Sequence, residues 1–171
     1  MANVKQDVVE IKWRKCDNEA QIPSKRDEDA GYDLYAISNV DIKLRPSETK
    51  LFHIGLVSIF DKNVVGIIKE RGSTGALGLS VRSGVIDSGY RGEWKVCLTN
   101  LNKYLVIFTN KVEKITIKKG LFKRIYYPLS KAIAQVVFIP IGKSASVIAT
   151  EEDIKNNNSE RQDTGWGASG K

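Results

Sequence analysis

One short segment of this sequence combines a carboxylate with an aromatic ring at a predicted turn. Residues 84–93 read GVIDSGYRGE, so Asp87 follows apolar residues and Tyr90 lies a few positions further on. Turn residues between apolar stretches favour a β-hairpin, with both side chains near its tip. A carboxylate in that position could act as a general base toward water. An ordinary surface hairpin would have the same composition, so the pattern alone leaves both interpretations open.

Two other segments offer groups that bind phosphate. Arg71 is followed by a glycine and by two hydroxyl residues, Ser73 and Thr74, and its guanidinium can hold phosphate with paired hydrogen bonds. A plain turn explains this segment equally well. Residues 165–171 match the start of a Walker A loop, but no Ser or Thr and no helix follows them, which argues against that motif. The glycines there would still let the backbone approach phosphates closely.

The other residues that could do chemistry are few. The single histidine, His53, stands in an apolar strand-like stretch, where a packed core or edge position is expected rather than a catalytic one. Cys16 and Cys97 are too isolated for a disulfide framework or a zinc site. The chemistry must therefore rest on carboxylates, hydroxyls, arginines and a borrowed metal. The formal charge of +7 suits an anionic partner, although solubility alone would also explain it.

Short β-branched runs separated by turn residues indicate the elements that carry these groups. No window has a sustained helical period, and only residues 74–78 could form a short helical turn. Many short strands at this spacing predict an all-β sandwich, jelly roll or barrel. The predicted strands are residues 8–13, 40–44, 51–60, 64–68, 96–98, 104–108 and 133–139, with a further one at 147–149.

The chain divides by composition into a β domain over residues 1–154 and a polar linker with a Gly-rich C-terminal arm over residues 155–171. Ends of this composition are usually mobile. No uncharged apolar run reaches the roughly 18 residues of a membrane span, and the N-terminus lacks the apolar core of a secretory signal. We therefore expect no membrane association and a cytoplasmic location.

Five segments, in order, resemble the motifs of the trimeric dUTPase family. Residues 30–36 (AGYDLYA) resemble A-G-x-D-L-x-A, and residues 71–73 (RGS) stand where R-S-S or R-S-G is expected. Residues 84–93 resemble G-V-I-D-x-x-Y-x-G almost letter for letter. Residues 133–135 (IAQ) resemble the end of G-D-R-I-A-Q, and residues 161–170 resemble R-G-x-x-G-F-G-S-T-G. The first and third segments are the most specific.

The resemblance implies an all-β, single-domain, jelly-roll-like β-barrel of the dUTPase type, assembled as a homotrimer. Each active site would form at subunit boundaries, and the C-terminal arm of one chain would close over a neighbour's site. The implied reaction is hydrolysis of dUTP to dUMP and pyrophosphate, with Mg²⁺ as cofactor. Asp87 would deprotonate the water that attacks the α-phosphorus. Asp33 would lie near the waters of the metal or pair with Arg71.

The resemblance also implies how substrate is bound. Tyr90 would pack beneath the deoxyribose and exclude a 2′-hydroxyl, while backbone groups of the hairpin would accept uracil and reject cytosine. Trp166 would stack over the uracil ring, and Arg161 would hold the γ-phosphate. The implied substrate-binding residues are Arg71, Gly72, Ser73, Gly84, Val85, Ile86, Asp87, Tyr90, Lys95, Gln135, Arg161, Gly165, Trp166, Gly167 and Ser169.

Two departures from the family pattern bear on these contacts. Gly72 replaces the usual serine, so a hydroxyl group is missing that Ser73 or Thr74 would have to supply. Lys131 and Ala132 replace the Asp-Arg pair of the fourth motif, which weakens its turn.

Residues 102–127 form a basic stretch between the third and fourth motif segments. With this stretch, the connection between those motifs is longer than two strands and a short turn require. We interpret it as an insert of extra strands outside the active site. Insertions of this kind occur in some viral and phage members of the family, which suggests such a source and a location in host cytoplasm. The insert would bind a protein or a nucleic acid, or would be a solvated hairpin.

Three other functions fit parts of the sequence. A dCTP deaminase shares the fold and much of the third motif, but it needs a glutamate where this sequence has Cys97. A dUTP-responsive regulatory protein would bind the nucleotide and act through the basic insert. A basic nucleic-acid-binding domain would show steeply salt-dependent binding to DNA.

Overall fold

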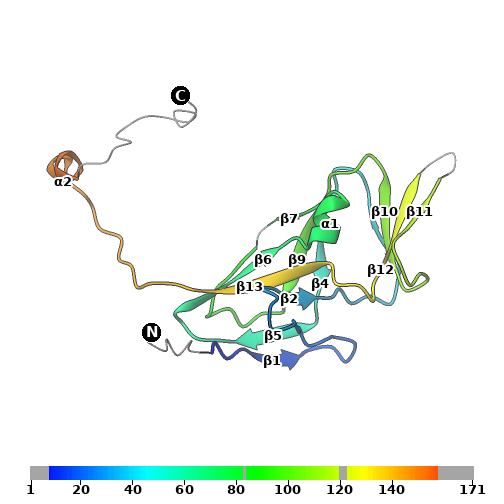
Figure 1. Cartoon of the computed structure of the whole chain (residues 1–171), viewed down its shortest axis with the longest axis horizontal. Helices are drawn as coiled ribbons and strands as arrows, with labels where there is room; N and C mark the ends of the chain where they lie inside the picture. The colour runs from blue at the N-terminus through cyan, green and yellow to red at the C-terminus, as the bar shows by residue number, and fades with distance from the viewer. Residues whose placement is uncertain (1–7, 83, 120–122, 158–171) are drawn as a thin grey trace. The chain divides into compact units, whose positions relative to one another are not determined.

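The computed structural model describes residues 8–82, 84–119 and 123–157 (Figure 1). The contacts predicted for Arg161, Gly165, Trp166, Gly167 and Ser169 lie outside these residues. Residue contacts divide the chain after Ile141 into a β domain and a short C-terminal unit.

The β domain contains all of the strands found in the described residues. Their order along the chain is β1 (Lys12–Lys15), β2 (Tyr32–Leu34), β3 (Ile42–Leu44), β4 (Thr49–His53), β5 (Leu56–Ile59), β6 (Val64–Lys69), β7 (Leu79–Arg82), β8 (Val85–Ile86), β9 (Lys95–Asn100), β10 (Leu105–Thr109), β11 (Thr116–Lys118), β12 (Arg124–Pro128) and β13 (Ala134–Pro140). One short helix, α1 (Gly72–Ala76), lies between β6 and β7, close to the short helical turn that the sequence predicted. The prediction of an all-β domain is confirmed.

The strands form small sheets that bring distant segments together. One sheet has the order β2-β13-β6-β8, and its pairs are antiparallel. Its register places Gln135 of β13 opposite Asp33 on one side and opposite Lys69 on the other. The other sheets have the orders β4-β9-β7, β11-β12-β10-β3 and β1-β5. Strand pairing therefore joins the first, third and fourth motif segments in one sheet, and the second motif segment follows directly after β6.

Alternating inward side chains of these strands form the hydrophobic core, as expected for strands with one buried face. Trp94 is fully buried, and its indole N–H donates to Ser58 Oγ at 3.0 Å, which satisfies its polar atom. The ring of Phe108 packs at 4.6 Å from Phe52 and at 5.2 Å from Tyr127, measured between centroids. These rings tie β4, β10 and β12 into one core.

The basic stretch 102–127 contributes to this core as well as to the surface. It contains β10, β11 and β12, which Figure 1 shows grouped at one side of the domain. The extra strands that the sequence predicted are therefore present. However, β10 carries the buried residues Val106 and Phe108, and β12 carries the buried residue Tyr127. Since β10 pairs with both β3 and β12, the stretch is built into the domain rather than attached outside it.

The C-terminal unit, described as far as residue 157, contains α2 (Glu151–Asn156). A capping box starts this helix: Thr150 Oγ1 accepts from the Asp153 N–H, and Asp153 accepts from the Thr150 N–H. The strand predicted at 147–149 is wrong, because these residues have no strand partner in the described chain. Val147 and Ile148 are 82% and 99% exposed. No helix in the described residues is long and apolar enough to cross a membrane.

Candidate active site

An ion pair between Arg71 and Asp33 lies at the centre of the first cluster of predicted site residues. Asp33 is in β2, and Arg71 is the N-cap residue of α1. Arg71 Nε lies 2.7 Å from Asp33 Oδ1, and about a quarter of each side chain is exposed, 28% and 26%. Such a charge-assisted bond fixes the orientation of the guanidinium while leaving other N–H groups for an anion. Of the two roles predicted for Asp33, this geometry supports the pairing with Arg71.

The start of α1 shows whether Ser73 or Thr74 can supply the hydroxyl group that is missing at Gly72. The Thr74 side chain is buried, and its Oγ1 accepts from the Arg71 N–H and donates to the Arg71 carbonyl at 3.0 Å. Thr74 therefore holds the turn and does not supply the missing hydroxyl. Ser73 lines the adjacent cavity. A Cβ atom at Gly72 would meet nothing within 4 Å, so the place of the family's usual serine is open space.

Gln135 is held in position from two sides. Its Nε2 donates to the Glu70 carbonyl at 2.8 Å, which connects β13 to the segment before α1. Gly31 packs so closely that an added Cβ would overlap Gln135 Oε1. A side chain at this position of the first motif segment would therefore displace the Gln135 amide.

The carboxylate of Glu70 supports the same loop. Its Oε1 accepts from the Val81 N–H at 2.7 Å, which ties the end of β6 to β7. Burial would raise the pKa of Glu70, but hydrogen bonds from backbone N–H groups, together with the nearby charge of Lys69, outweigh it, so the pKa lies below its usual value. Glu70 is therefore an ionised structural support rather than a proton donor.

These residues surround a cavity of about 690 Å³. Besides the predicted residues it is lined by Lys25 and Arg26, which sequence reasoning missed although they lie just before the first motif segment. Arg26 is engaged with Asp29, with Nε 2.9 Å from Oδ2. The cavity thus offers several basic groups and a hydroxyl group, a set that suits a phosphorylated ligand. Its lining residues are Ser24, Lys25, Arg26, Asp29, Ala30, Gly31, Asp33, Arg71, Gly72, Ser73 and Gln135.

Two tyrosines lie beside the ion pair and were also missed. Burial raises the pKa of Tyr35, and the charge of Asp33 adds to this effect. Tyr127 is fully buried, and its hydroxyl donates to the Ala132 carbonyl at 2.7 Å. Burial raises the pKa of Tyr127 to about 12, although the nearby charge of Arg71 acts in the opposite direction. Tyr35 stands at a variable position of the first motif segment and Tyr127 lies in no motif, so only the folded chain reveals their surroundings.

The segment with Asp87, residues 84–93, forms a second cluster. The β-hairpin predicted here is wrong in its pairing, because β8 pairs with β6 while β9 pairs with β4 and β7, and we call residues 84–93 the hairpin segment only for their turn. β8 pairs with β6, and the Gly84 carbonyl accepts from the Ile68 N–H at 2.7 Å. A Cβ at Gly84 would lie 2.5 Å from the Ile68 carbonyl oxygen, so this close approach requires glycine. Asp87 is exposed at the turn, as predicted. Val85 is 65% exposed, so one face of the hairpin is open to a ligand or a partner.

Tyr90 is fixed at the far side of the turn. Its N–H donates to the Asp87 carbonyl at 3.0 Å, and its hydroxyl donates to the Glu93 carbonyl at 3.0 Å. The ring lies so close to Gly92 that a Cβ there would overlap the Tyr90 hydroxyl. Tyr90 is nevertheless 43% exposed, which leaves part of its side chain available for contact.

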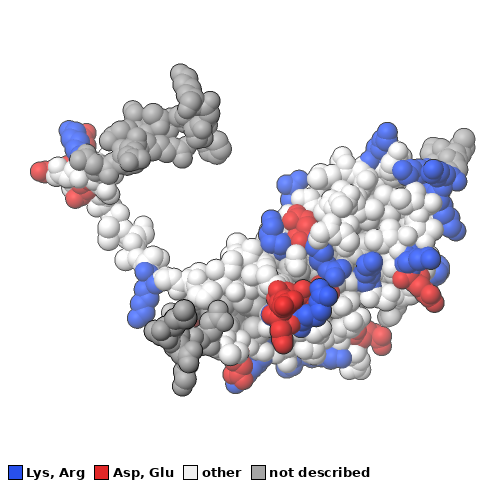
Figure 2. Space-filling model, viewed as in Figure 1, with Lys and Arg blue, Asp and Glu red and all other residues white. Residues whose placement is uncertain are grey.

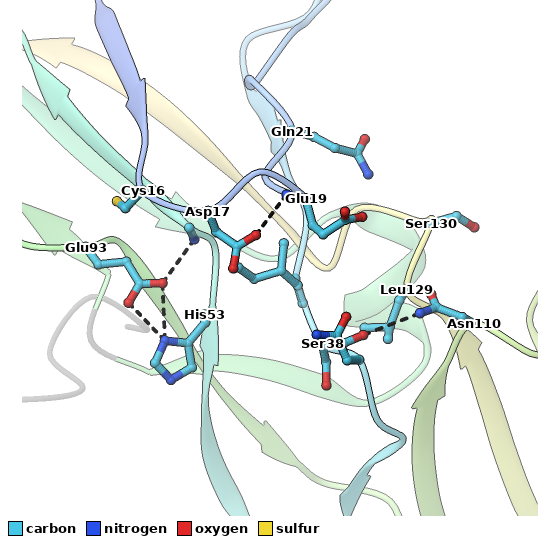
Figure 3. Close-up of a pocket in the computed structure, with 14 residues that line it drawn as sticks. Cys16, Asp17, Glu19, Gln21, Ser38, His53, Glu93, Asn110, Leu129 and Ser130 are labelled. Atoms are coloured by element: carbon cyan, nitrogen blue, oxygen red, sulfur yellow. Dashed lines mark hydrogen bonds and ion pairs between the residues drawn. The ribbon is translucent and has the colours of Figure 1, made fainter.

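Glu93, at the end of this segment, is anchored next to a separate cavity of about 550 Å³, shown in Figure 3. His53 Nδ1 lies 2.9 Å from Glu93 Oε2, and the Gly55 N–H donates to Glu93 Oε1 at 3.0 Å. His53 is 56% exposed, so it is an edge rather than a core residue. This cavity contains none of the predicted site residues, and we assign its His53–Glu93 pair a structural role.

Within one chain the two clusters remain separate. None of the hairpin residues Gly84, Val85, Ile86, Asp87 and Tyr90 lines the cavity around Arg71. Lys95, at the start of β9, is exposed and pairs in register with His53. In the described part of the chain, no group of three or more His, Cys, Asp or Glu residues could hold a metal ion.

Comparisons with known sequences agree with this arrangement. Residues 17–170 match the dUTPase family model. The deoxyuridine 5′-triphosphate nucleotidohydrolase of Clostridium kluyveri is 32% identical over 166 residues, which cover 95% of this chain and 99% of that protein. The protein of the same name from Mycolicibacterium gilvum is 37% identical over 105 residues, covering 59% of this chain and 67% of that protein. The alignment with its Mycobacterium leprae (strain TN) counterpart spans 62% of that protein.

Solved structures show the same fold. The dUTPase of Staphylococcus bacteriophage 80alpha, determined with dUpNHpp, superposes with a TM-score of 0.73 at 22% identity, covering 95% of this chain and 99% of that one. The EIAV dUTPase gives a TM-score of 0.60 at 25% identity, covering 83% of this chain and 98% of that one. The chain belongs to the dUTPase family. The predicted jelly-roll-like fold and the predicted enzyme family are confirmed.

Proposed function

We propose that this chain hydrolyses dUTP to dUMP and pyrophosphate, with Asp87 as the general base. The observation that carries the proposal is the pairing of two features in a dUTPase-family chain. One is an arginine held by Asp33 in a cavity with Ser73 and Gln135. The other is an exposed aspartate at a turn that the hydrogen bonds of Tyr90 hold in place.

The phosphate groups of the substrate would occupy the cavity. Arg71 would donate to the α- and β-phosphates while Asp33 keeps its guanidinium oriented, and Gln135 and Ser73 would complete the contact. Fixed donors of this kind stabilise charge that develops on phosphate oxygens without rearranging during the reaction. General-base help from Asp87 would contribute only about 10²–10⁴-fold, so positioning and charge must supply the rest.

The hairpin would select the nucleoside. Backbone groups around Val85 and Ile86 would pair with uracil, and the same polar groups would be left unpaired by cytosine. Tyr90, whose ring is fixed by its bond to the Glu93 carbonyl, would leave no room for a 2′-hydroxyl.

The residues present fit Mg²⁺ held mainly by the substrate. Mg²⁺ keeps several waters and commonly binds through one or two carboxylates together with substrate phosphates. The available carboxylates, Asp33 in its ion pair and the exposed Asp87, suit contacts through water rather than a closed protein cage. When bound, the ion would neutralise charge on the phosphate oxygens. A structural Mg(II) ion is described for the dUTPase of phage phi11.

We further propose that the active sites form between chains of a homotrimer. The separation of the Asp87 hairpin from the Arg71 cavity within one chain supports this, since a complete site then needs a neighbour. The exposed apolar residues Val147 and Ile148 also suit a surface that another chain covers. Arg161, Trp166 and Ser169 would reach a site from the C-terminal arm.

The decisive assay for the activity measures pyrophosphate release from dUTP, dCTP, dTTP and UTP in the presence of Mg²⁺. We expect release from dUTP alone, and a loss of more than a hundredfold in kcat for Asp87→Asn. Glu113→Gln, which neutralises an exposed carboxylate far along the chain, is the matched control and should keep full activity. Equal rates for Asp87→Asn and the parent would remove Asp87 from this role, and ammonia release from dCTP would indicate a deaminase instead.

Mixed assemblies test the subunit arrangement. Asp87→Asn and Arg71→Ala chains should each be inactive, but refolding them together should restore part of the activity, because some sites then combine an intact hairpin with an intact cavity. Light scattering on the parent should give the mass of a trimer. Inactivity of the mixture, despite a confirmed mixed trimer, would place both residues in the same chain's site.

A second candidate function concerns the basic insert, whose surface favours a polyanion such as nucleic acid. β11 is an edge strand, and the hairpin β11–β12 exposes many cations, which Figure 2 shows at this end of the domain. The exposed basic residues of the insert are Lys103, Lys111, Lys114, Lys118, Lys119 and Arg124. Lysines also protect edge strands from aggregation, which is the simpler explanation.

Salt dependence separates these two explanations. If the insert binds nucleic acid, affinity for a DNA duplex should fall steeply between 50 and 200 mM salt. The double substitution Lys118→Glu with Lys119→Glu should abolish that binding and leave dUTP hydrolysis intact, whereas Lys12→Glu with Lys62→Glu should change it little. An absence of DNA binding by the parent at low salt would leave only the protective role.

A further inference from the structure

The last residue of the hairpin segment, Glu93, connects the Tyr90 turn to the corner between β4 and β5. Its backbone carbonyl accepts from the Tyr90 hydroxyl at 3.0 Å. Its carboxylate accepts from the Gly55 N–H at 3.0 Å and lies 2.9 Å from His53 Nδ1. Figure 3 shows Glu93 and His53 facing one another, joined by dashed lines. This one residue therefore links the Tyr90 ring to two residues of the corner.

That corner is fixed by its own hydrogen bonds. The Cys16 N–H donates to the Gly55 carbonyl at 2.8 Å, and the Ile37 N–H donates to the His53 carbonyl at 2.9 Å. Gly55 has a φ of +69°, which residues with side chains rarely adopt, and a Cβ there would lie 2.8 Å from Ile37 Cδ1. The groups that hold the Glu93 carboxylate therefore have fixed positions.

The planar peptide between Glu93 and Trp94 is held at both of its ends. Trp94 is fully buried, and its backbone N–H donates to the Leu56 carbonyl at 2.8 Å. This bond alone would let the peptide pivot about its N–H group. The Glu93 carboxylate anchors the other end through Gly55. The direction of the Glu93 carbonyl, which accepts from Tyr90, is therefore set by both anchors.

The Tyr90 ring depends on that carbonyl for its position. The residue is 43% exposed, so packing fixes the ring less firmly than it fixes a core side chain. Its hydroxyl lies against Gly92, where an added Cβ would overlap it. Without the bond to the Glu93 carbonyl, rotation about the side-chain torsions would turn the ring away from this place.

We propose that Glu93 is a positioning residue that sets the selection of deoxyribose over ribose through Tyr90. This inference rests on the proposed function and names a determinant of its substrate class. The Glu93 carboxylate is engaged at the corner, so it acts on the substrate only through the carbonyl that holds Tyr90. The structural role of the His53–Glu93 pair thus extends to keeping the ring where a 2′-hydroxyl would collide with it.

The test is Glu93→Ala, measured by equilibrium binding of dUpNHpp and of UpNHpp, its ribonucleotide counterpart. We expect the preference for dUpNHpp, the ratio of the two dissociation constants, to fall about tenfold, because a loosened ring admits the 2′-hydroxyl. The ratio of kcat/KM for dUTP to that for UTP should fall equally, through KM rather than kcat. Glu93→Gln keeps an acceptor for the Gly55 N–H and should retain most of the preference.

Glu48→Ala is the matched control. The Glu48 carboxylate accepts from the Arg45 N–H at 2.6 Å and lies 3.1 Å from Lys50 Nζ, so it has the same two kinds of partner at the opposite end of β4. This variant should leave the preference for dUpNHpp unchanged. An equal loss of preference in Glu48→Ala and Glu93→Ala would overturn the proposal, because a general loosening of the domain would then explain both.

A purely structural role for Glu93 would give a different result. Glu93→Ala would then lower the melting temperature and leave the preference for dUpNHpp unchanged, which would also overturn the proposal. If Glu93→Ala does not fold, His53→Ala provides the readout, because it removes one partner of the carboxylate and leaves the Gly55 N–H. We expect a loss of preference of roughly two- to threefold for this partly exposed pair, and no loss would count against the inference.

The binding readout needs no hydrolysis, so the two proposals fail separately. A parent protein that prefers dUpNHpp but releases no pyrophosphate from dUTP would refute the proposed function. The loss of that preference in Glu93→Ala would still support the role of Glu93.

Discussion

Arg71 Nε and Asp33 Oδ1 lie 2.7 Å apart and join the N-cap of α1 to β2. The register of the central sheet makes this pair possible, because β13 places Gln135 between Asp33 and Lys69. The phosphate cavity is therefore a product of strand pairing. Each residue on its wall depends on a neighbour for its orientation, and the predictions below address these dependences.

Replacing Asp33 by Asn should weaken substrate binding more than folding. The substitution keeps a hydrogen-bond acceptor but removes the charge that orients Arg71, so kcat/KM for dUTP should fall roughly tenfold. Because the pair is partly exposed, the free energy of unfolding should fall by only about 1 kcal/mol. Asp41→Asn, which breaks the exposed pair with Lys111 at 3.0 Å, is the matched control for steady-state kinetics. Equal effects of both substitutions on kcat/KM would contradict a specific role for Asp33.

Gly31→Ala should displace Gln135. An added methyl group overlaps Gln135 Oε1, so the amide must rotate away and lose its bond to the Glu70 carbonyl. We expect a loss of about 1–3 kcal/mol in the free energy of unfolding by urea titration and a marked rise in KM for dUTP. Gly142→Ala, where a Cβ meets nothing within 4 Å, should leave the unfolding free energy unchanged. A Gly31→Ala protein as stable and active as its parent would show that Gln135 is free to move.

Gly72→Ser should restore a missing contact. A Cβ at Gly72 meets nothing within 4 Å, so a serine side chain fits without strain and places a hydroxyl group beside the cavity. We expect KM for dUTP to fall severalfold, since one added hydrogen bond to a charged phosphate contributes about 1.5–3 kcal/mol at most. Initial-rate kinetics on Gly72→Ser and on Gly72→Ala would separate the hydroxyl from the effect of the side chain itself. An identical KM for both variants would mean that residue 72 does not contact the substrate.

The ionised Glu70 should make stability depend on pH. Its pKa is lower in the folded chain than in the unfolded chain, so its charge contributes stability above the unfolded value of about 4.3. That contribution is lost as pH falls through the folded pKa. Glu70→Gln keeps an acceptor for the Val81 N–H but removes the charge. Unfolding measured from pH 7 to pH 3 should therefore show the parent more stable at neutral pH and the two proteins converging in acid, while a constant difference would exclude the charge as the cause.

The sequence predicted which chemical groups the site contains, but it did not predict how these groups contact one another. Asp87 and Tyr90 were placed at a hairpin turn because apolar residues and glycines bracket them, and the structure has that turn. Ser73 and Thr74 could not be distinguished, because they are neighbours with the same hydroxyl chemistry. Only the folded chain shows that the Thr74 hydroxyl is used to hold the Arg71 backbone.

The sequence by itself determined the fold class and the order of the motif segments, because periodicity and turn residues are local properties. The tertiary structure decided which residues meet, because strand register and side-chain packing join positions far apart in the chain. Tyr127 has no motif to mark it, yet the fold buries its ring against Phe108 and brings its hydroxyl to the Ala132 carbonyl. The strand expected at 147–149 has the right residue types, but a strand forms only where a partner satisfies its backbone groups, and the described chain supplies none.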